Sequence, residues 1–284
     1  MPELPEVETV KERLKKKIIG KKIEDIIIRS SSIIKHPSEE HFVNKLRQQV
    51  VNDIKRRGKW LIIELNQYYL LVHLRMEGKF LFKTSEEIYN KHEHVIFNLN
   101  NKLQLRYHDT RKFGKMHLIT KDELDKIKAL NKLGLEPFDK KLNKEYLQEK
   151  LKHKKIPIKT ALLDQSIIAG IGNIYVNEIL FLSAINPIKP SNKVNINELG
   201  LIIKNTQQVL KKAIKLGGTT IRTYTSLDGE TGLFQKELLV HGRKGEVCIK
   251  CDNIISKIKV GGRGTYYCPK CQPMKKLDIL PKKL

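Results

Sequence analysis

Met-Pro-Glu-Leu-Pro-Glu-Val-Glu-Thr-Val, residues 1–10, is the stretch around which we interpret the rest of the chain. Pro2 and Pro5 carry φ angles already suited to the first turn of a helix, and the acidic side chains lie where a helix dipole is positive. An apolar stripe at helical spacing continues to Ile18, and Gly20 is a suitable stop. These residues predict an amphipathic N-terminal helix.

The same stretch also has a chemical interpretation. Once Met1 is removed, Pro2 presents a secondary α-amine, whose pKa of roughly 8 leaves about a tenth of it as free base at pH 7. Such an amine attacks a carbonyl to give a positively charged iminium, which acts as an electron sink. Glu3 can supply the acid or base that this chemistry needs. An ordinary helix without a catalytic role is the alternative at this point.

Composition limits the classes of protein to consider. The chain has 284 residues, enough for two domains, and its net charge is +24, from 55 Lys and Arg against 31 Asp and Glu. This excess favours nucleic acid or an anionic membrane as partner, although a lysine-rich proteome would also produce it. No apolar run approaches the roughly 20 residues of a membrane span, and the first helix is too charged for a secretory signal. We therefore expect a cytoplasmic protein that acts on nucleic acid and not at a membrane.

The strongest motif is formed by the four cysteines, Cys248-x2-Cys251-x16-Cys268-x2-Cys271. Each Cys-x-x-Cys allows two thiolates to reach one tetrahedral ion, and the clustering is typical of a reducing compartment. We predict one structural zinc ion, because four thiolates leave no position for a catalytic water. Two short strands lie between the cysteine pairs, and Arg263 on the glycine-rich turn that joins them can grip a phosphate in two places.

The N-terminal half has the pattern of a β-sheet protein. A strand is predicted over residues 23–29, and a period near two predicts six more strands between residues 60 and 119, joined by short polar turns. This pattern favours an antiparallel sandwich or barrel. Three loop stretches are functional candidates: residues 56–59, residues 73–78 and residues 109–114.

Each of these loop stretches has two interpretations from its residues alone. The basic turn that contains Lys59 can grip phosphates or can be a solvated face. Met76 lies in a polar turn but could fill the core. Phe113, close to Arg111, can act as an apolar wedge between bases or as a buried anchor of its loop.

The C-terminal half has helical patterns. A capping box at Thr120 predicts a helix that ends near Gly134, where a proline-containing break marks a domain boundary. Further helices are predicted over residues 143–153, 159–169 and 195–216. The turn Gly170-Ile171-Gly172-Asn173 can hold an anion with its amides, or can be a plain helix–turn–helix. We predict domains over residues 1–134, 135–236 and 237–272, the last a zinc finger, and a disordered tail over residues 273–284.

Four of these motifs together resemble the formamidopyrimidine-DNA glycosylase (Fpg) family, in the family's order and across nearly the whole chain. They are the Pro-Glu terminus, Arg-x-Phe-Gly, Gly-Ile-Gly-Asn and the zinc hairpin. The resemblance implies an α+β fold, in which an N-terminal antiparallel β-sandwich carries a catalytic N-terminal helix. A C-terminal helical domain then combines a helix-two-turn-helix motif with a zinc β-hairpin finger.

The resemblance also implies a function and a set of site residues. The expected protein is a monomeric DNA glycosylase that flips oxidised purines out of double-stranded DNA, excises them, and cleaves the strand by β,δ-elimination as an AP lyase. The implied catalytic residues are Pro2 as nucleophile, Glu3 as proton donor, and Lys59 and Arg263 at phosphates. The implied DNA-binding residues are His73, Met76, His92, Arg111, Phe113, Lys159 and Asn173, of which Met76, Arg111 and Phe113 fill the space left by the flipped nucleotide and Lys159 points into the lesion site. Residues 219–232 correspond to a lid over the flipped base, and Glu6 and Glu77 are minor candidates near the site.

Two alternatives stay open. The endonuclease VIII branch has the same fold and removes oxidised pyrimidines, but its terminus usually reads Pro-Glu-Gly-Pro-Glu. Leu4 and the Arg-x-Phe-Gly motif favour the purine branch. A basic zinc-ribbon protein that only binds DNA is the alternative from another class, and it predicts salt-sensitive binding without a covalent intermediate.

Overall fold

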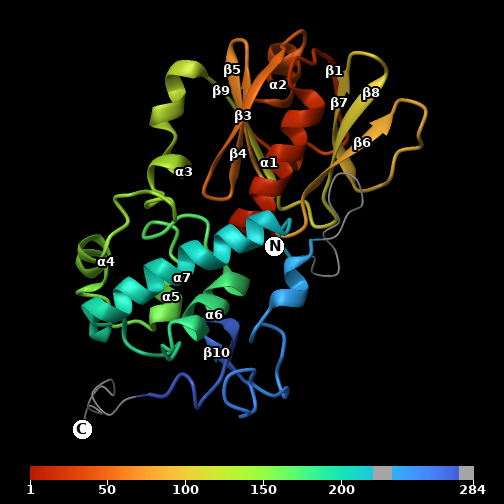
Figure 1. Cartoon of the computed structure of the whole chain (residues 1–284). Coiled ribbons are helices and arrows are strands. Elements are labelled where there is room, and N and C mark those ends of the chain that lie inside the picture. Colours follow the sequence, from red (N-terminus) through yellow and green to blue (C-terminus); the bar gives the residue numbers. More distant parts are fainter. Residues whose placement is uncertain (220–231, 275–284) are drawn as a thin grey trace. The chain divides into compact units, whose positions relative to one another are not determined.

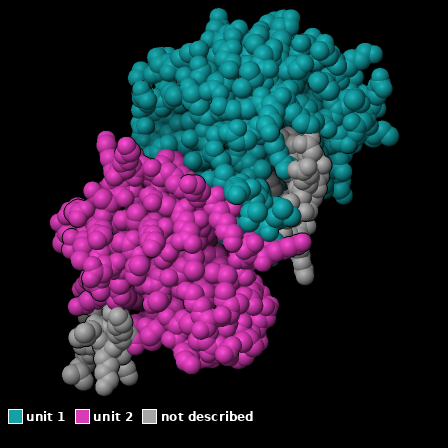
Figure 2. Space-filling model, viewed as in Figure 1, with its two compact units in different colours: residues 1–131, 214–235 teal, residues 132–213, 236–284 magenta. Residues whose placement is uncertain are grey.

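The computed structural model describes residues 1–219 and 232–274, and the chain divides into two compact units (Figure 1). Unit 1 contains residues 1–131 and 214–235, and unit 2 contains residues 132–213 and 236–284 (Figure 2). The chain therefore passes from one unit to the other three times. Within the described ranges, no helix is both long enough and apolar enough to cross a membrane.

Unit 1 is a sandwich of two sheets. One sheet has four strands in the order β1-β7-β8-β6, and the other has five in the order β2-β9-β5-β4-β3. The strands are β1 (Ile23–Ile28), β2 (Ile34–His36), β3 (Val51–Arg57), β4 (Trp60–Leu65), β5 (Tyr68–His73), β6 (Lys79–Thr84), β7 (Glu93–Leu99), β8 (Leu103–His108) and β9 (Lys115–Thr120). The expected sandwich is confirmed, with one difference: β2 pairs with β9 in the parallel direction.

Two of these strands, β2 and β3, were not predicted from the sequence. β3 buries only Val51 and Ile54 and otherwise carries polar and charged side chains, so it lacks an alternating apolar face. β2 is only three residues long and is preceded by a 3-10 helix, η1 (Ser31–Ile33). The neighbouring helix α2 (Glu39–Leu46) begins after Ser38.

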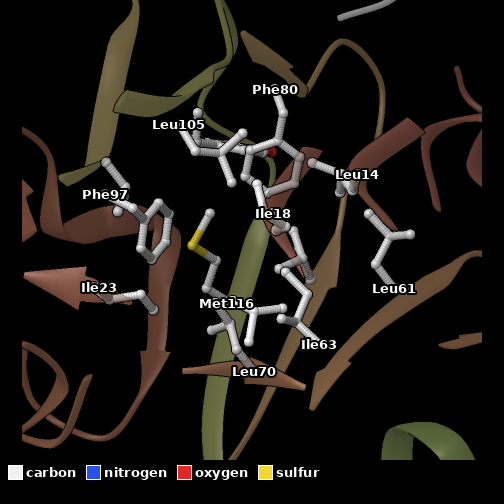
Figure 3. Close-up of a cluster of buried hydrophobic side chains, with 14 of the residues drawn as sticks. Leu14, Ile18, Ile23, Leu61, Ile63, Leu70, Phe80, Phe97, Leu105 and Met116 are labelled. Atoms are coloured by element: carbon white, nitrogen blue, oxygen red, sulfur yellow. The ribbon is translucent and has the colours of Figure 1, made fainter. Parts of the chain in front are cut away.

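The N-terminal helix α1 (Leu4–Ile18) is part of the sandwich core. Its apolar stripe is buried, and Leu14 and Ile18 lie in one cluster with Ile63 and other strand residues (Figure 3). The helix starts with a capping box, in which the Glu6 carboxylate accepts the Glu3 N–H at 2.8 Å. The start of the chain is thereby fixed on the sandwich.

The helix predicted to follow Thr120 is broken into two pieces. The capping box is present, because Glu123 accepts hydrogen bonds from the Thr120 N–H and hydroxyl. However, the first piece is a 3-10 helix, η2 (Lys121–Lys126), and it is separated from α3 (Lys128–Asn131) by Ile127. The backbone of Ile127 is extended, with ψ at 107°, which interrupts helical hydrogen bonding.

Unit 2 is mainly helical. Its elements are α4 (Lys144–Leu151), α5 (Ile158–Leu162), α6 (Asn173–Leu182), η3 (Ser191–Lys193), α7 (Ile196–Lys215), η4 (Phe234–Glu237) and the antiparallel hairpin of β10 (Ser256–Val260) and β11 (Arg263–Tyr267). The last two residues of α7 and the first two of η4 belong to unit 1. α5 is shorter than the predicted helix over 159–169, because the Asp164 carboxylate accepts the Ser166 N–H at 3.0 Å and turns the chain. Of the predicted tail, residues 275–284 lie outside the described residues.

Candidate active site

Two connections between the sheets form one end of the sandwich of unit 1. Residues 74–78, here called crossover 1, lead from β5 to β6, and residues 109–114, crossover 2, lead from β8 to β9. β5 pairs with β9 in one sheet, and β6 pairs with β8 in the other. The two crossovers therefore run side by side, because hydrogen-bonded strands flank them at both ends.

The crossovers carry the three side chains predicted to enter the DNA. Met76 is 39% exposed and Phe113 is 50% exposed, although both are large and apolar. The Arg111 guanidinium stacks on the Phe113 ring, 4.5 Å from its centroid. An exposed apolar wedge beside a cation is suited to insertion into a base stack.

A buried aspartate shapes crossover 2. Asp109 is fully buried, and its carboxylate accepts the Arg111 N–H at 3.1 Å and the Gly114 N–H at 2.8 Å. A hydrogen bond from the Thr110 hydroxyl to Glu77 ties this crossover to crossover 1. The two loops that carry the inserting side chains are therefore joined to each other as well as to the sheets.

The turn that carries Lys59 is fastened to α1. Arg56 donates to the Glu8 carboxylate at 2.6 Å and to the Gly58 carbonyl at 2.9 Å. Burial would raise the pKa of Glu8, but hydrogen bonds from Lys11 and Arg56 lower it below its ordinary value, so Glu8 stays a carboxylate. Gly58 permits the turn with a φ of +57°. Lys59 itself is largely buried next to this turn.

At the N-terminus, Pro2 and Glu3 are buried, whereas Met1 is exposed. The Glu6 carboxylate uses both oxygens: Oε2 accepts the Glu3 N–H, and Oε1 accepts the Thr219 N–H at 2.8 Å and its hydroxyl at 3.1 Å. Glu6 thus connects the start of α1 to Thr219, the first residue of the predicted lid. Residues 220–231 of that lid lie outside the described residues.

His73 lies at the same end of the sandwich, at the last position of β5. Its ring meets Trp60 edge-on at 4.9 Å, and its Nδ1 accepts the Arg75 N–H at 3.0 Å. Burial lowers the pKa of His73 to about 3, assisted by the charges of Arg75, Lys59 and Lys115. The ring is therefore neutral at physiological pH and can contact a phosphate only as a neutral hydrogen-bond donor.

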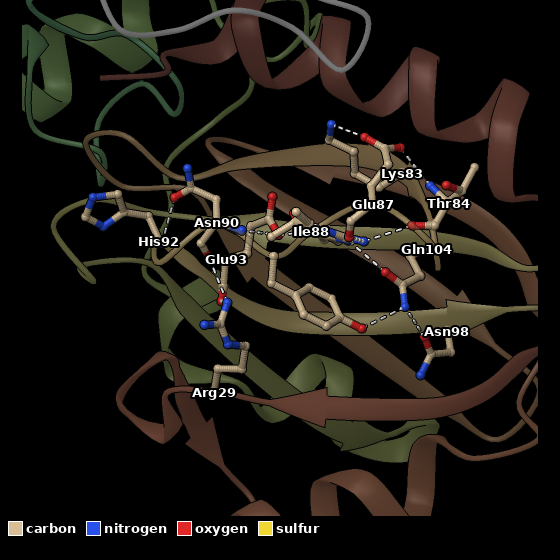
Figure 4. Close-up of polar contacts among 12 residues, drawn as sticks. Arg29, Lys83, Thr84, Glu87, Ile88, Asn90, His92, Glu93, Asn98 and Gln104 are labelled. Atoms are coloured by element: carbon tan, nitrogen blue, oxygen red, sulfur yellow. Dashed lines mark hydrogen bonds and ion pairs between the residues drawn. The ribbon is translucent and has the colours of Figure 1, made fainter.

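His92 follows a loop whose polar contacts, among them those of Thr84, Glu87 and Glu93, are drawn in Figure 4. A buried arginine, Arg106, organises this loop. The Arg106 guanidinium forms an ion pair with Glu93 at 3.0 Å and donates to three backbone carbonyls and to Gln104. The carbonyl of His92 accepts the Asp109 N–H at 3.0 Å, which places His92 beside crossover 2.

In unit 2, a buried lysine joins two predicted DNA-binding elements. Lys159 of α5 is fully buried, and its ammonium donates to Asn173 Oδ1 at 2.8 Å, to the Gly264 carbonyl at 3.0 Å and to Thr265 Oγ1 at 2.7 Å. Asn173 also donates to the Gly264 carbonyl, at 3.1 Å. Arg263, which is exposed, directly precedes Gly264, so this network holds the hairpin of Arg263 against the first turn of α6. That Lys159 points into a lesion site stays a prediction.

The four cysteines form one metal site. Their Sγ atoms all lie within 4.8 Å of one another, with 3.4 Å between Cys251 and Cys268 and 3.9 Å between Cys248 and Cys271. A tetrahedral zinc ion with Zn–S bonds of about 2.3 Å requires sulfur–sulfur distances of about 3.8 Å, which these cysteines match. Two backbone N–H groups, of Lys250 and Cys271, donate to the sulfurs of Cys248 and Cys268 at 3.5 Å.

Sequence reasoning missed several buried polar residues that shape the site. Glu178 of α6 accepts the backbone N–H groups of Leu239, Val240 and His241 at 2.8, 3.1 and 2.8 Å, and so fixes the segment before the finger. An acidic residue inside the apolar run of α6 was an available signal, because a buried carboxylate needs donors. Asp109, at the start of a polar turn that ends in glycine, was another. Nothing in the sequence pattern marked Arg106.

Comparisons with known proteins identify the class. Three family models match: Formamidopyrimidine-DNA glycosylase N-terminal domain over residues 1–116, Formamidopyrimidine-DNA glycosylase H2TH domain over residues 133–225, and Zinc finger found in FPG and IleRS over residues 245–273. Together with the sandwich and the four-cysteine site, these matches define a zinc-finger DNA glycosylase with a helix-two-turn-helix domain.

Individual relatives agree. The formamidopyrimidine-DNA glycosylase of Bacillus cereus is 46% identical over 274 residues, which cover 96% of this chain and 99% of that protein. The one from Oceanobacillus iheyensis is 47% identical over 276 residues, covering 97% and 99%. A mutant of Lactococcus lactis Fpg, solved with Fapy-dG-containing DNA, matches with a TM-score of 0.92 at 41% identity, covering 96% and 100%. A complex of Lactococcus lactis Fpg with abasic-site DNA matches with a TM-score of 0.91, at the same identity and coverage.

The chain belongs to the formamidopyrimidine-DNA glycosylase family. This confirms the predicted family, the fold class and the single structural zinc site.

Proposed function

We propose that this protein excises oxidised purines, such as 8-oxoguanine and formamidopyrimidines, from double-stranded DNA and then cleaves the strand as an AP lyase. The observation that carries the proposal is the start of the chain, where Pro2 and Glu3 are buried immediately before the first turn of a core helix and a capping box between Glu3 and Glu6 fixes that turn. The Lactococcus lactis relatives were solved with Fapy-dG and abasic-site DNA, which supports the same substrate class here.

The proposed reaction begins with the N-terminal amine. After removal of Met1, the Pro2 nitrogen attacks C1′ of the flipped nucleotide, and the bond from C1′ to the damaged base breaks as the base leaves with its electron pair. Glu3 donates a proton to O4′, so that the sugar ring opens and an iminium forms. Loss of a C2′ proton then expels the 3′ phosphate, and a second elimination expels the 5′ phosphate.

The remaining residues would bind and shape the DNA. Lys59 and Arg263 would contact the phosphates next to the lesion, and Met76, Arg111 and Phe113 would fill the space that the flipped nucleotide leaves. His73, His92 and Asn173 are the further DNA contacts that we propose, and Lys159 the one at the lesion. We expect the protein to act as a monomer in the cytoplasm.

The first test is borohydride trapping on an 8-oxoguanine:C duplex. Protein with Pro2 at its terminus is compared with protein that carries an N-terminal extension, and we expect a covalent adduct from the first form alone. An adduct from both forms would move the nucleophile to an internal lysine. Tight, salt-sensitive binding without any adduct would support the alternative hypothesis, in which the protein binds DNA but does not act on it.

Substrate class needs a second comparison. We expect faster excision from 8-oxoguanine:C than from thymine-glycol duplexes, because Leu4 and the Arg-x-Phe-Gly motif match the purine branch. A preference for thymine glycol would instead favour an activity like that of endonuclease VIII.

A further inference from the structure

Tyr107 lies between the two crossovers of unit 1. Its side chain is fully buried near the end of β8, and its ring packs edge-on against Phe80 of β6, with 5.4 Å between the centroids. The two residues are also direct partners in the β6–β8 ladder. The tyrosine ring is therefore held by the core, and its hydroxyl has a fixed position.

The Tyr107 hydroxyl touches the glycine that ends each crossover. A methyl group added to Gly78 would lie 2.1 Å from Tyr107 Oη, and one added to Gly114 would lie 1.8 Å from it. At Gly114 the three nearest atoms all belong to Tyr107, and the φ angle is outside the left-handed region. At Gly114 the tyrosine ring, and not the backbone conformation, is what excludes a larger residue.

Each crossover has a defined backbone. The Gly78 N–H donates to the Leu74 carbonyl at 3.0 Å in crossover 1, and the Asp109 carboxylate holds crossover 2. Each loop also contains one left-handed residue that is not glycine, Arg75 with φ of 56° and Lys112 with φ of 55°. Such conformations persist only where the surroundings fix them. Two fixed loops that touch the same hydroxyl have a fixed separation.

We propose that Tyr107 is a positioning residue that sets the distance between Met76 and the stacked pair of Arg111 and Phe113. The inference rests on the proposed function, in which these three side chains enter the space left by the flipped nucleotide. Met76 is two residues from Gly78 and Phe113 adjoins Gly114, so a shift of either glycine moves an inserting side chain. A displacement of about 1 Å in such a site can reduce the rate about a hundredfold.

The test uses Gly114→Ala with two DNA substrates under single-turnover conditions. On an 8-oxoguanine:C duplex we expect the excision rate to fall about tenfold or more. On a single-stranded abasic oligonucleotide, which has no opposing strand and no space to fill, we expect strand cleavage to change less than about twofold. A general loss of folding would reduce both rates together.

A second substitution checks that the effect acts through Tyr107. Leucine lacks the hydroxyl oxygen and the two ring carbons that lie nearest to the added methyl group, so Gly114→Ala combined with Tyr107→Leu should excise faster than Gly114→Ala alone. Tyr107→Phe removes only the hydroxyl and should slow duplex excision selectively, by a smaller factor. If Gly114→Ala does not fold, Tyr107→Phe alone tests the proposal.

Gly200→Ala is the matched control, because its added methyl group meets only the flexible end of the Lys144 side chain, and both rates should be unchanged. Equal losses on duplex and single-stranded DNA, or strictly additive effects in the double variant, would refute the role of Tyr107. So would full duplex activity of both Gly114→Ala and Tyr107→Phe. Inactive wild-type protein would refute the proposed function, and this inference with it.

Discussion

At the scale of single residues, the polar groups that matter most in unit 1 are buried. Arg106 and Asp109 are both fully buried, yet Arg106 organises the loop before His92 and Asp109 organises crossover 2. Burying such groups costs free energy unless all their hydrogen bonds are made. The exposed side chains that face the DNA in our proposal therefore depend on the hydrogen bonds that Arg106 and Asp109 make in the interior of unit 1.

Arg106 should be essential for folding of unit 1. Arg106→Met leaves the Glu93 carboxylate buried without its cation and removes donors from the carbonyls of Thr84 and Glu87. We expect the free energy of unfolding to fall by about 3 to 5 kcal/mol, measured by denaturant titration. Arg29→Met, which alters an exposed arginine that donates to neighbouring carbonyls, should cost less than about 1 kcal/mol. Equal losses in the two variants would contradict this explanation.

His73 should make stability depend on pH. Its pKa of about 3 in the folded protein lies below the ordinary value of 6.5, so the unfolded chain binds the proton first as the pH falls. The contribution is complete above pH 6.5 and is lost toward pH 3, at about 1.4 kcal/mol for each unit. His73→Asn keeps an acceptor for the Arg75 N–H but does not titrate. Between pH 7 and pH 5, we expect wild-type protein to lose about 2 kcal/mol more than the variant, and parallel pH profiles would show that His73 is not the cause.

At the scale of elements, the sequence predicts those strands and helices whose apolar residues recur with a clear period. The strands β4 to β9 match the predicted segments within a residue or two, since each buries one face or both. β3 was missed because its charged residues hide its period, and α5 was overextended because the local turn at Asp164 ends it early. Pro2, Lys59 and Arg263 were predicted by motif. The role of Tyr107 was not, because a buried tyrosine in a strand looks like any core residue until Gly78 and Gly114 are seen on either side of it.

Folding of the zinc hairpin should depend on the bound metal. Cys248 and Cys268 belong to a small buried cluster with Phe181, Val240 and Ile255, so the metal site and its apolar core form together. We expect about one equivalent of zinc in wild-type protein and a large loss of it in Cys268→Ser, measured by elemental mass spectrometry. DNA binding should fall with the zinc. Chelation of wild-type protein should have the same effect and should be reversed by added zinc; unaltered DNA binding after chelation would separate the hairpin from DNA contact.

At the scale of the whole molecule, the net charge of +24 is much larger than the charge of the few cations that we propose to contact DNA phosphates. Such a charge draws a protein to DNA over a distance, without regard to sequence, and in our proposal the contacts of the two units then determine which site it binds. Each unit contributes cations to this field, Lys59 and Arg111 in unit 1 and Arg263 in unit 2. Affinity and specificity should therefore respond differently to salt.

The salt dependence of binding tests this division. We expect Arg263→Ala to weaken binding to all duplexes and to reduce the slope of log Kobs against log salt by about one. Lys244→Ala removes the same charge from an exposed position in the same unit and should change the slope less, because salt screens charges that do not touch the DNA. Equal slopes for the two variants would mean that Arg263 contributes only to the general field.

The cysteine site has a consequence for the way the protein meets oxidants. Without the metal, the sulfur pairs 3.4 and 3.9 Å apart are close enough for an oxidant to convert them into disulfide bonds. Those disulfide bonds would prevent zinc binding until a reductant restored the thiols. Bound zinc holds the sulfurs as ligands and so protects them. Freshly made protein is therefore most vulnerable in the interval before loading, and preparations exposed to air should lose activity according to how incompletely they were filled with zinc.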